Sequence, residues 1–140
     1  MRRFCARPSG VALSATGRCC PNVLTATSLP WIGSTYTATA TGMPALGLAF
    51  SVRGFTGTSI PLSTILPQGI AGCSQLVSLD MLDLYLPTAG TVTTPFVIPN
   101  TLALANFVLH HQVVAVELDP LANITALTST NALSLTIGAF

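Results

Sequence analysis

Residues 34–41 have the sequence Ser-Thr-Tyr-Thr-Ala-Thr-Ala-Thr, and this strict alternation is the clearest structural signal in the chain. Successive side chains of a β-strand point to opposite faces, so Tyr36, Ala38 and Ala40 would share one face. The opposite face would carry only threonines, namely Thr35, Thr37, Thr39 and Thr41. This pattern is typical of a strand that is half buried, with its tyrosine and alanines toward the core.

The same period of two recurs in residues 91–98 and 133–137. Further strands are expected near residues 11–15, 22–28, 46–53, 74–86 and 107–118. Turn-forming proline and glycine residues separate these segments, and only residues 99–106 could hold a single helical turn. The sequence therefore predicts an all-β fold, an antiparallel β-sandwich of the Ig-like or Greek-key type.

The segment 107–118 is expected to be the most buried strand. Val108, Val114, Val116 and Leu118 share one face of it. An apolar face of this length predicts a central position in its sheet.

The composition is poor in charge and rich in hydroxyl groups. Charged residues make up 6% of the 140 residues, and the mean hydropathy is +0.68, whereas about 25% of an ordinary soluble domain is charged. The uncharged stretch from Cys19 to Val52 is nevertheless interrupted every few residues by threonine, glycine or proline. No run approaches the ~20 apolar residues of a spanning helix, so no membrane span is expected.

Nucleic-acid binding is not expected either. All five cations are arginines, and four of them, Arg2, Arg3, Arg7 and Arg18, precede the first clear strand. The remainder of the chain has one arginine and no lysine, too little positive charge for affinity to a phosphate backbone.

The four cysteines, Cys5, Cys19, Cys20 and Cys73, are disulfide candidates. A bridge between the neighbours Cys19 and Cys20 is the least favoured pairing. The other pairings join Cys5 to one of this pair and Cys73 to the other. The long bridge would close a loop of more than about 50 residues and stabilise the fold by roughly 4 kcal/mol. Disulfide staples predict an extracellular or cell-surface location.

No constellation of residues predicts catalysis or metal binding. His110 and His111 are adjacent on a strand and point to opposite faces, so they cannot chelate one metal ion. Asp80 with Asp83, or Asp119 with Asn123, could contribute oxygen ligands to a calcium ion, but Asp and Asn commonly cap turns, which is the favoured interpretation. The sequence predicts a protein that is not an enzyme and that has no metal or cofactor.

Two other features bear on possible ligands. Trp31, Tyr36 and Tyr85 could form an aromatic surface for stacking on sugars, if they are exposed together. Asn123-Ile-Thr125 is a formal glycosylation sequon, so Asn123 is a possible point of glycan attachment.

The shortage of charge favours self-association. Edge strands of natural sheets are usually protected by lysine or other charged residues, which this chain almost lacks. A threonine-rich strand without such protection presents a flat, neutral surface. We therefore expect a homo-oligomer or polymer.

From Asn22 onward, the order of short motifs resembles a domain that recurs in secreted proteins of planctomycetes and related bacteria. The motifs are Leu24-Thr-Ala-Thr-Ser-Leu-Pro-Trp-Ile-Gly33, Thr41-Gly-Met-Pro44, Ile70-Ala-Gly-Cys-Ser74, Val97-Ile-Pro-Asn100, Phe107 with Gln112, Asp119-Pro-Leu-Ala-Asn123 and Ser129-Thr-Asn-Ala-Leu-Ser-Leu-Thr-Ile-Gly138. Together they cover most of the chain.

The resemblance implies an exported β-sandwich that is often attached to larger surface proteins and has no established enzymatic role. Here Cys5 and Cys19 belong to an additional segment, so we expect an N-terminal arm over residues 1–20 and a sandwich domain over 21–140. The expected function is an extracellular structural protein that assembles into a filament, tube or surface layer. The alternative is a secreted module that binds carbohydrate or another surface.

Overall fold

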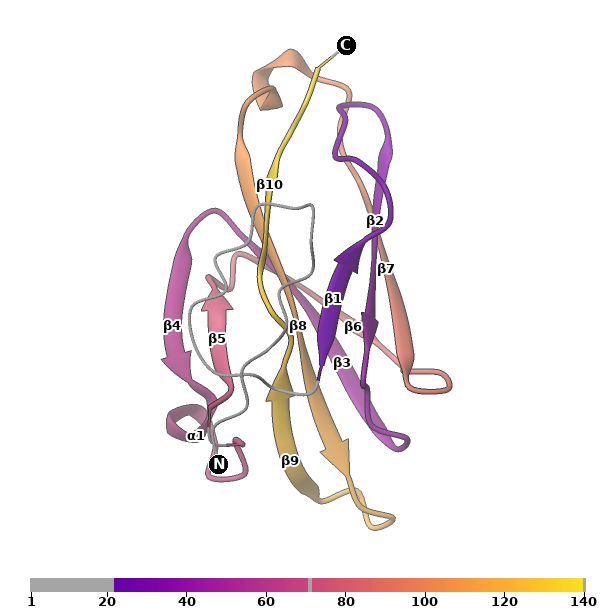
Figure 1. Ribbon diagram of the computed structural model, residues 1–140, viewed down its shortest axis with the longest axis vertical. Coiled ribbons are helices and arrows are strands. Elements are labelled where there is room, and N and C mark those ends of the chain that lie inside the picture. Colours follow the sequence, from indigo (N-terminus) through magenta and orange to yellow (C-terminus); the bar gives the residue numbers. More distant parts are fainter. Residues whose placement is uncertain (1–21, 71, 140) are drawn as a thin grey trace.

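The computed structural model describes residues 22–70 and 72–139. The expected arm, its cysteines Cys5, Cys19 and Cys20, and the strand expected at 11–15 lie outside these residues. The described part is almost entirely β-structure (Figure 1). Its elements are β1 (Val23–Ala26), β2 (Thr35–Thr41), β3 (Gly47–Gly54), β4 (Gly57–Pro61), α1 (Leu62–Ile65), β5 (Ser74–Val77), β6 (Met81–Tyr85), β7 (Thr91–Val97), the 3₁₀ turn η1 (Leu102–Leu104), β8 (Val108–Leu118), β9 (Ile124–Ser129) and β10 (Leu133–Thr136).

The strands form three antiparallel sheets. A three-stranded sheet has the order β1-β2-β7, and a five-stranded sheet has the order β10-β8-β3-β6 with β9 also pairing with β8. The third sheet is the pair β4-β5. The all-β antiparallel class is thus confirmed, whereas the Ig-like sandwich type and the disulfide staples remain predictions.

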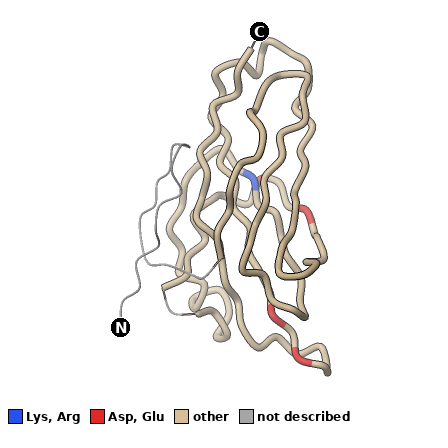
Figure 2. Tube along the Cα trace, turned by 45° about the vertical axis from the view of Figure 1, so that its right-hand side comes forward, with Lys and Arg blue, Asp and Glu red and all other residues tan. Residues whose placement is uncertain are grey.

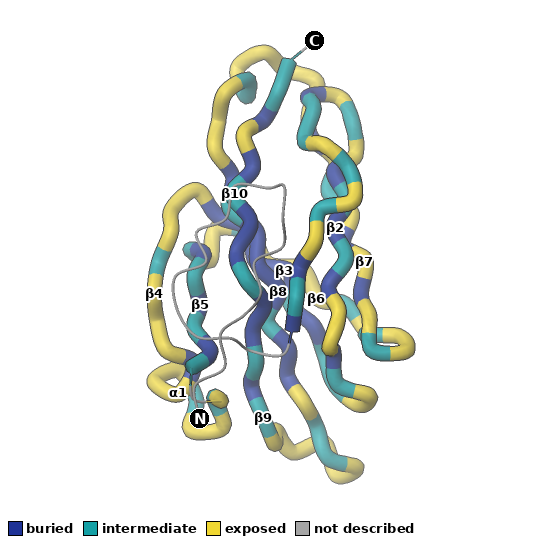
Figure 3. Tube along the Cα trace, in the orientation of Figure 1, coloured by how far each residue is buried: buried dark blue, intermediate teal, exposed yellow. Residues whose placement is uncertain are grey.

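The main core lies between the three-stranded and five-stranded sheets (Figure 3). Tyr36, Ala38 and Ala40 of β2 are fully buried there, as their alternation with threonine predicts. Val113 and Ala115 of β8 meet them from the other sheet, and neither is exposed. These inward faces hold the two larger sheets together.

The central position predicted for β8 is also confirmed, because β3 pairs with one of its edges and β9 and β10 with the other. Its most buried apolar residues, however, are Leu109, Val113 and Ala115 rather than the predicted set. Val108, Val114, Val116 and Leu118 lie on the outer face of the sheet, where Val108 is exposed. The strand carries apolar residues on both faces, so its pattern alone did not show which face is central to the core.

The single strand expected over residues 74–86 is divided into β5 and β6. A turn at Ser78–Asp80 separates them, and a carboxylate oxygen of Asp80 accepts hydrogen bonds from the Phe55 amide and the Ser78 hydroxyl. Asp80 therefore caps a turn instead of continuing a strand. The elements β4, α1 and β9 were not expected from the sequence.

Several sheet edges are capped by the chain itself. Asn131 accepts a hydrogen bond from the Leu24 amide (2.9 Å) and donates one to the Leu24 carbonyl (3.1 Å), which imitates a neighbouring strand beside β1. At β9, the Leu127 amide donates to the Gln68 carbonyl and the Leu127 carbonyl accepts from Ile70. Gln112 similarly caps β5, because it accepts from the Leu76 amide and donates to the Ser74 carbonyl.

The outer edge of β7 has a different protection. The Ile98 amide donates to the Ser34 carbonyl beside β2. Amides alternate in direction along a strand, so an amide at position 95, three residues earlier, would point away from the sheet, and this position is occupied by Pro95. Proline has no amide to offer there, as is usual for an edge strand. In the described part, no strand pairs with the outer edges of β4 and β6. Edge-to-edge pairing is therefore restricted for the three-stranded sheet, and the exposed face of that sheet becomes the larger candidate surface.

Replacing Asn131 with alanine should destabilise the fold by about 1–3 kcal/mol, because both backbone groups of Leu24 lose their partner in a partly buried place. The free energy of unfolding in urea measures the effect. Asn100→Ala is the matched control, since Asn100 is exposed, and it should change stability by less than about 0.5 kcal/mol. Equal stability of the two variants would show that the amide does not cap β1.

Candidate functional site

The exposed face of the three-stranded sheet is a candidate contact surface, here called the threonine face. Its threonines, contributed by β1, β2 and β7, are Thr25, Thr35, Thr37, Thr39, Thr41, Thr91 and Thr93. Val23, Pro95 and Val97 lie on the same face. The registers align Thr25, Thr39 and Thr93 in one row across all three strands. Both faces predicted for residues 34–41 are therefore present as expected.

The threonine face carries no charge. The charged residues of the described part are Arg53 and the four acids, and none of them lies on β1, β2 or β7 (Figure 2). Within that part, the hydroxyls of Thr39 and Thr93 have no hydrogen-bond partner. They remain available to water or to another molecule.

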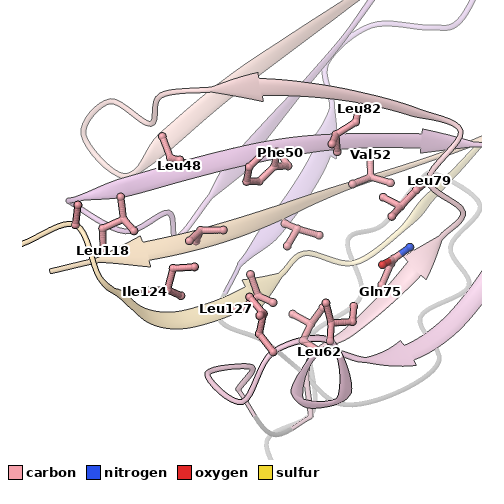
Figure 4. Close-up of a pocket in the computed structure, with 15 residues that line it drawn as sticks. Leu48, Phe50, Val52, Leu62, Gln75, Leu79, Leu82, Leu118, Ile124 and Leu127 are labelled. Atoms are coloured by element: carbon pink, nitrogen blue, oxygen red, sulfur yellow. The ribbon is translucent and has the colours of Figure 1, made fainter.

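A second candidate site is an apolar groove of about 580 Å³ on the outer face of the five-stranded sheet (Figure 4). Side chains of β3, β8 and β9 form its floor, including Phe50, Val116 and Leu127. Leu62 and Ile65 of α1 form one wall, and Leu82 of β6 lies at the opposite side. The groove is lined almost wholly by aliphatic side chains.

Gln75 is the polar residue in the lining of the groove. Its side chain is 8% exposed, and its amide nitrogen donates to the Val77 carbonyl at 2.9 Å. No charged side chain lines the groove. It can therefore offer dispersion contacts and apolar burial, but no ionic recognition inside.

The main core contains a buried polar cluster that the sequence did not reveal. The Ser51 hydroxyl lies 2.8 Å from Nε2 of His111, and the Tyr36 hydroxyl lies 3.2 Å from Nδ1 of the same ring. Arg53 is nearby, where it pairs with Asp83 and stacks over Phe96. These contacts join β2, β3, β6, β7 and β8 across the core.

The contact between Ser51 and His111 resembles part of a nucleophile–base pair, but its setting is unsuitable for a substrate. Ser51 and Tyr36 have no exposed surface, and His111 is 1% exposed. The acid Asp83 bonds to Arg53 rather than to the histidine. The cluster gives the buried side chains of Tyr36, Ser51 and His111 hydrogen-bond partners and links the sheets, whereas the buried Nε of Arg53 has none.

Burial, helped by the nearby positive charge of Arg53, lowers the pKa of His111 to about 3. Burial also raises the pKa of Tyr36 above its ordinary value, although Arg53 opposes this shift. Both rings are therefore neutral at physiological pH. A neutral His111 ring can accept a hydrogen bond from one of its two hydroxyl partners and donate a hydrogen bond to the other.

The remaining candidate residues have local roles or are dispersed. His110 points away from His111, as expected, and bonds to Ser134 at 3.0 Å. Asp119 accepts from the Leu121 and Asn123 amides, and these bonds, that of Asn123 foremost, lower its pKa. No group of three or more potential metal-binding side chains occurs within residues 22–70 and 72–139.

The three aromatic residues do not form a common surface. Tyr36 is fully buried, and Tyr85 is half-buried and packs against the main core. Trp31 is half-buried and contacts the backbone of Gly138. Tyr36 cannot stack on a sugar because its ring lies between the sheets.

The sequon residue Asn123 is exposed. Its side chain donates to Asp119 at 3.2 Å, and the site lies in the turn between β8 and β9. Cys73 is buried in a smaller apolar cluster with Leu62 and Leu127. The other candidate cysteines are outside the described residues, so the structure does not define the pairing.

Comparison of the chain with protein-family models, curated proteins and solved structures finds no match. The resemblance to a secreted planctomycete domain therefore stays a prediction. In the described part of the chain, no helix has the length and apolar character needed to cross a membrane.

His111 should make stability depend on pH. Its pKa is about 3 when folded and near 6.5 when exposed, so the unfolded state binds more protons as the pH falls below 6.5. The free energy of unfolding should decrease by about 1.4 kcal/mol per pH unit between roughly pH 6 and pH 4. Urea unfolding at each pH measures the slope.

His111→Gln should remove most of that slope, whatever its own stability at neutral pH. His110→Gln is the control, because its side chain lies on the opposite face of β8, and the slope should persist in it. A slope that survived in His111→Gln would contradict the buried neutral ring.

Proposed function

We propose that this chain is an extracellular structural domain without enzymatic activity that associates with copies of itself through the threonine face. The observation that carries the proposal is the uncharged row of Thr25, Thr39 and Thr93 across three strands. The low charge of the whole chain supports it, because copies repel one another weakly.

The chemistry of threonine suits such a contact. Its methyl group gains from leaving water, while its hydroxyl can donate to and accept from a hydroxyl of the facing copy. No ion pair has to be desolvated, so the association should depend little on salt. The caps at Asn131 and Pro95 further favour contact between faces over pairing along edges.

We further propose the Ig-like sandwich as the fold type, with disulfide staples that include Cys73. The shared core of the two larger sheets supports the sandwich. The burial of Cys73 beside α1 supports a staple that holds this segment against the sheet. Such bridges persist in an oxidising compartment, which agrees with an extracellular or cell-surface location.

Thr39→Lys should weaken self-association more than about tenfold, because it places an unpaired charge at the centre of the threonine face. Sedimentation velocity over a range of concentrations measures it, and thermal unfolding checks that the variant is folded. The parent chain should associate equally at low and high salt.

Ser59→Lys is the matched control. Ser59 is exposed on β4, outside the three-stranded sheet, and receives the same added charge. It should associate like the parent chain. A parent chain that stays monomeric at high concentration would overturn the proposed function. Equal association of both lysine variants would exclude the threonine face as the contact.

A further inference from the structure

The apolar groove remains unexplained by self-association through the threonine face, because it lies on the other sheet. Several of its aliphatic residues are strongly exposed: Leu79 is 61% exposed, Leu82 55% and Ile65 46%. Exposed apolar groups gathered in one concave place mark a binding site more often than isolated ones do. The volume of about 580 Å³ is within the range of small-molecule sites.

The groove has a fixed wall as well as a floor. The Leu62 amide donates to the Cys73 carbonyl, which ties α1 to the start of β5. Gly69 packs so closely under α1 that a Cβ atom there would lie 2.3 Å from the carbonyl carbon of Leu62. The wall therefore stands over the strands at a set position, and a flat sheet face of another copy could not reach the floor.

The interior chemistry selects an apolar occupant. A polar ligand would lose its hydrogen bonds to water, while Gln75 is already bonded to Val77 and the other lining side chains are apolar. A flexible hydrocarbon chain has no hydrogen bonds to water to lose, and its apolar surface is buried along the strands.

The charges beside the groove restrict the head group of such a ligand. Asp80 adjoins the lining residue Leu79 in the turn before β6. The Asp119 carboxylate accepts from the Leu121 and Asn123 amides, on either side of the lining residue Ala122. Hydrogen bonds, first from the Phe55 amide and then from the Ser78 hydroxyl, lower the pKa of Asp80, so this carboxylate is ionised. The one cation of the described part, Arg53, lies on the core face of β3 and is paired with Asp83.

We propose that the groove binds the hydrocarbon chain of an amphiphile whose head group is neutral or positively charged. The aliphatic lining holds the chain, and the head group stays in water near the carboxylates. An anionic head group is disfavoured by the same carboxylates.

Isothermal titration calorimetry at low salt tests the proposal with dodecyltrimethylammonium and dodecanoate, each below its micelle concentration. The cationic probe should bind the full chain with one-to-one stoichiometry. Dodecanoate has a comparable alkyl chain and should bind about threefold to fivefold more weakly, as expected for exposed charges.

Two leucine variants locate the site. Leu82→Gln should weaken binding of the cationic probe about tenfold, because Leu82 lines the groove. Leu84→Gln is the control: Leu84 lies on the same strand and face and is 56% exposed, but it does not line the groove. It should bind like the parent, and thermal unfolding should show both variants folded.

Absence of saturable binding, or equal weakening by both variants, would overturn the proposal. Sedimentation velocity of the same variants tests the other possible occupant of the groove, which is a second copy of the chain. If Leu82→Gln reduced self-association and no probe bound, the groove would be a contact between copies. The threonine face is tested by separate substitutions, so either proposal can fail without the other.

Discussion

The structure depends on the two long central strands, β3 and β8, carrying apolar residues on both faces. One face is covered by the three-stranded sheet, where Ala49, Val113 and Ala115 are fully buried. The other face carries Phe50 and Val116 and is covered only in part by α1 and the β4-β5 pair. The incomplete cover creates the groove, since a short helix and a two-stranded sheet cannot bury a five-stranded face.

The scarcity of charge has a structural counterpart in where the few charged groups lie. Arg53 is buried in the core, where Asp83 and the ring of Phe96 compensate it, and Asp80 and Asp119 cap turns. No charge is left on β1, β2 or β7 to interrupt the threonine face. The fold thus uses its charges for local structure, and its sheet faces differ only in their proportion of hydroxyl and aliphatic groups.

Local sequence patterns predicted the features that depend on residues close together in the chain, namely strands and their buried faces. The strands β2 and β7 and the buried side of residues 34–41 follow from alternation alone. The groove was not predicted, because its lining comes from β3, α1, β6, β8 and β9, which are far apart in the sequence. The cluster around His111 was missed for the same reason, since Ser51 and Tyr36 reach it from two other strands.

The threonine face and the apolar groove differ in how favourably water solvates them. Threonine hydroxyls keep their hydrogen bonds to solvent, so the threonine face can be exposed at little cost until a matching hydroxyl surface replaces the water. The apolar groove forms no such hydrogen bonds, because the side chains of Phe50 and Leu82 offer water neither a donor nor an acceptor. A partner for the first face must therefore supply hydrogen bonds, whereas an occupant of the second needs only apolar volume. The two faces therefore differ in the chemistry of the partner that each can accept.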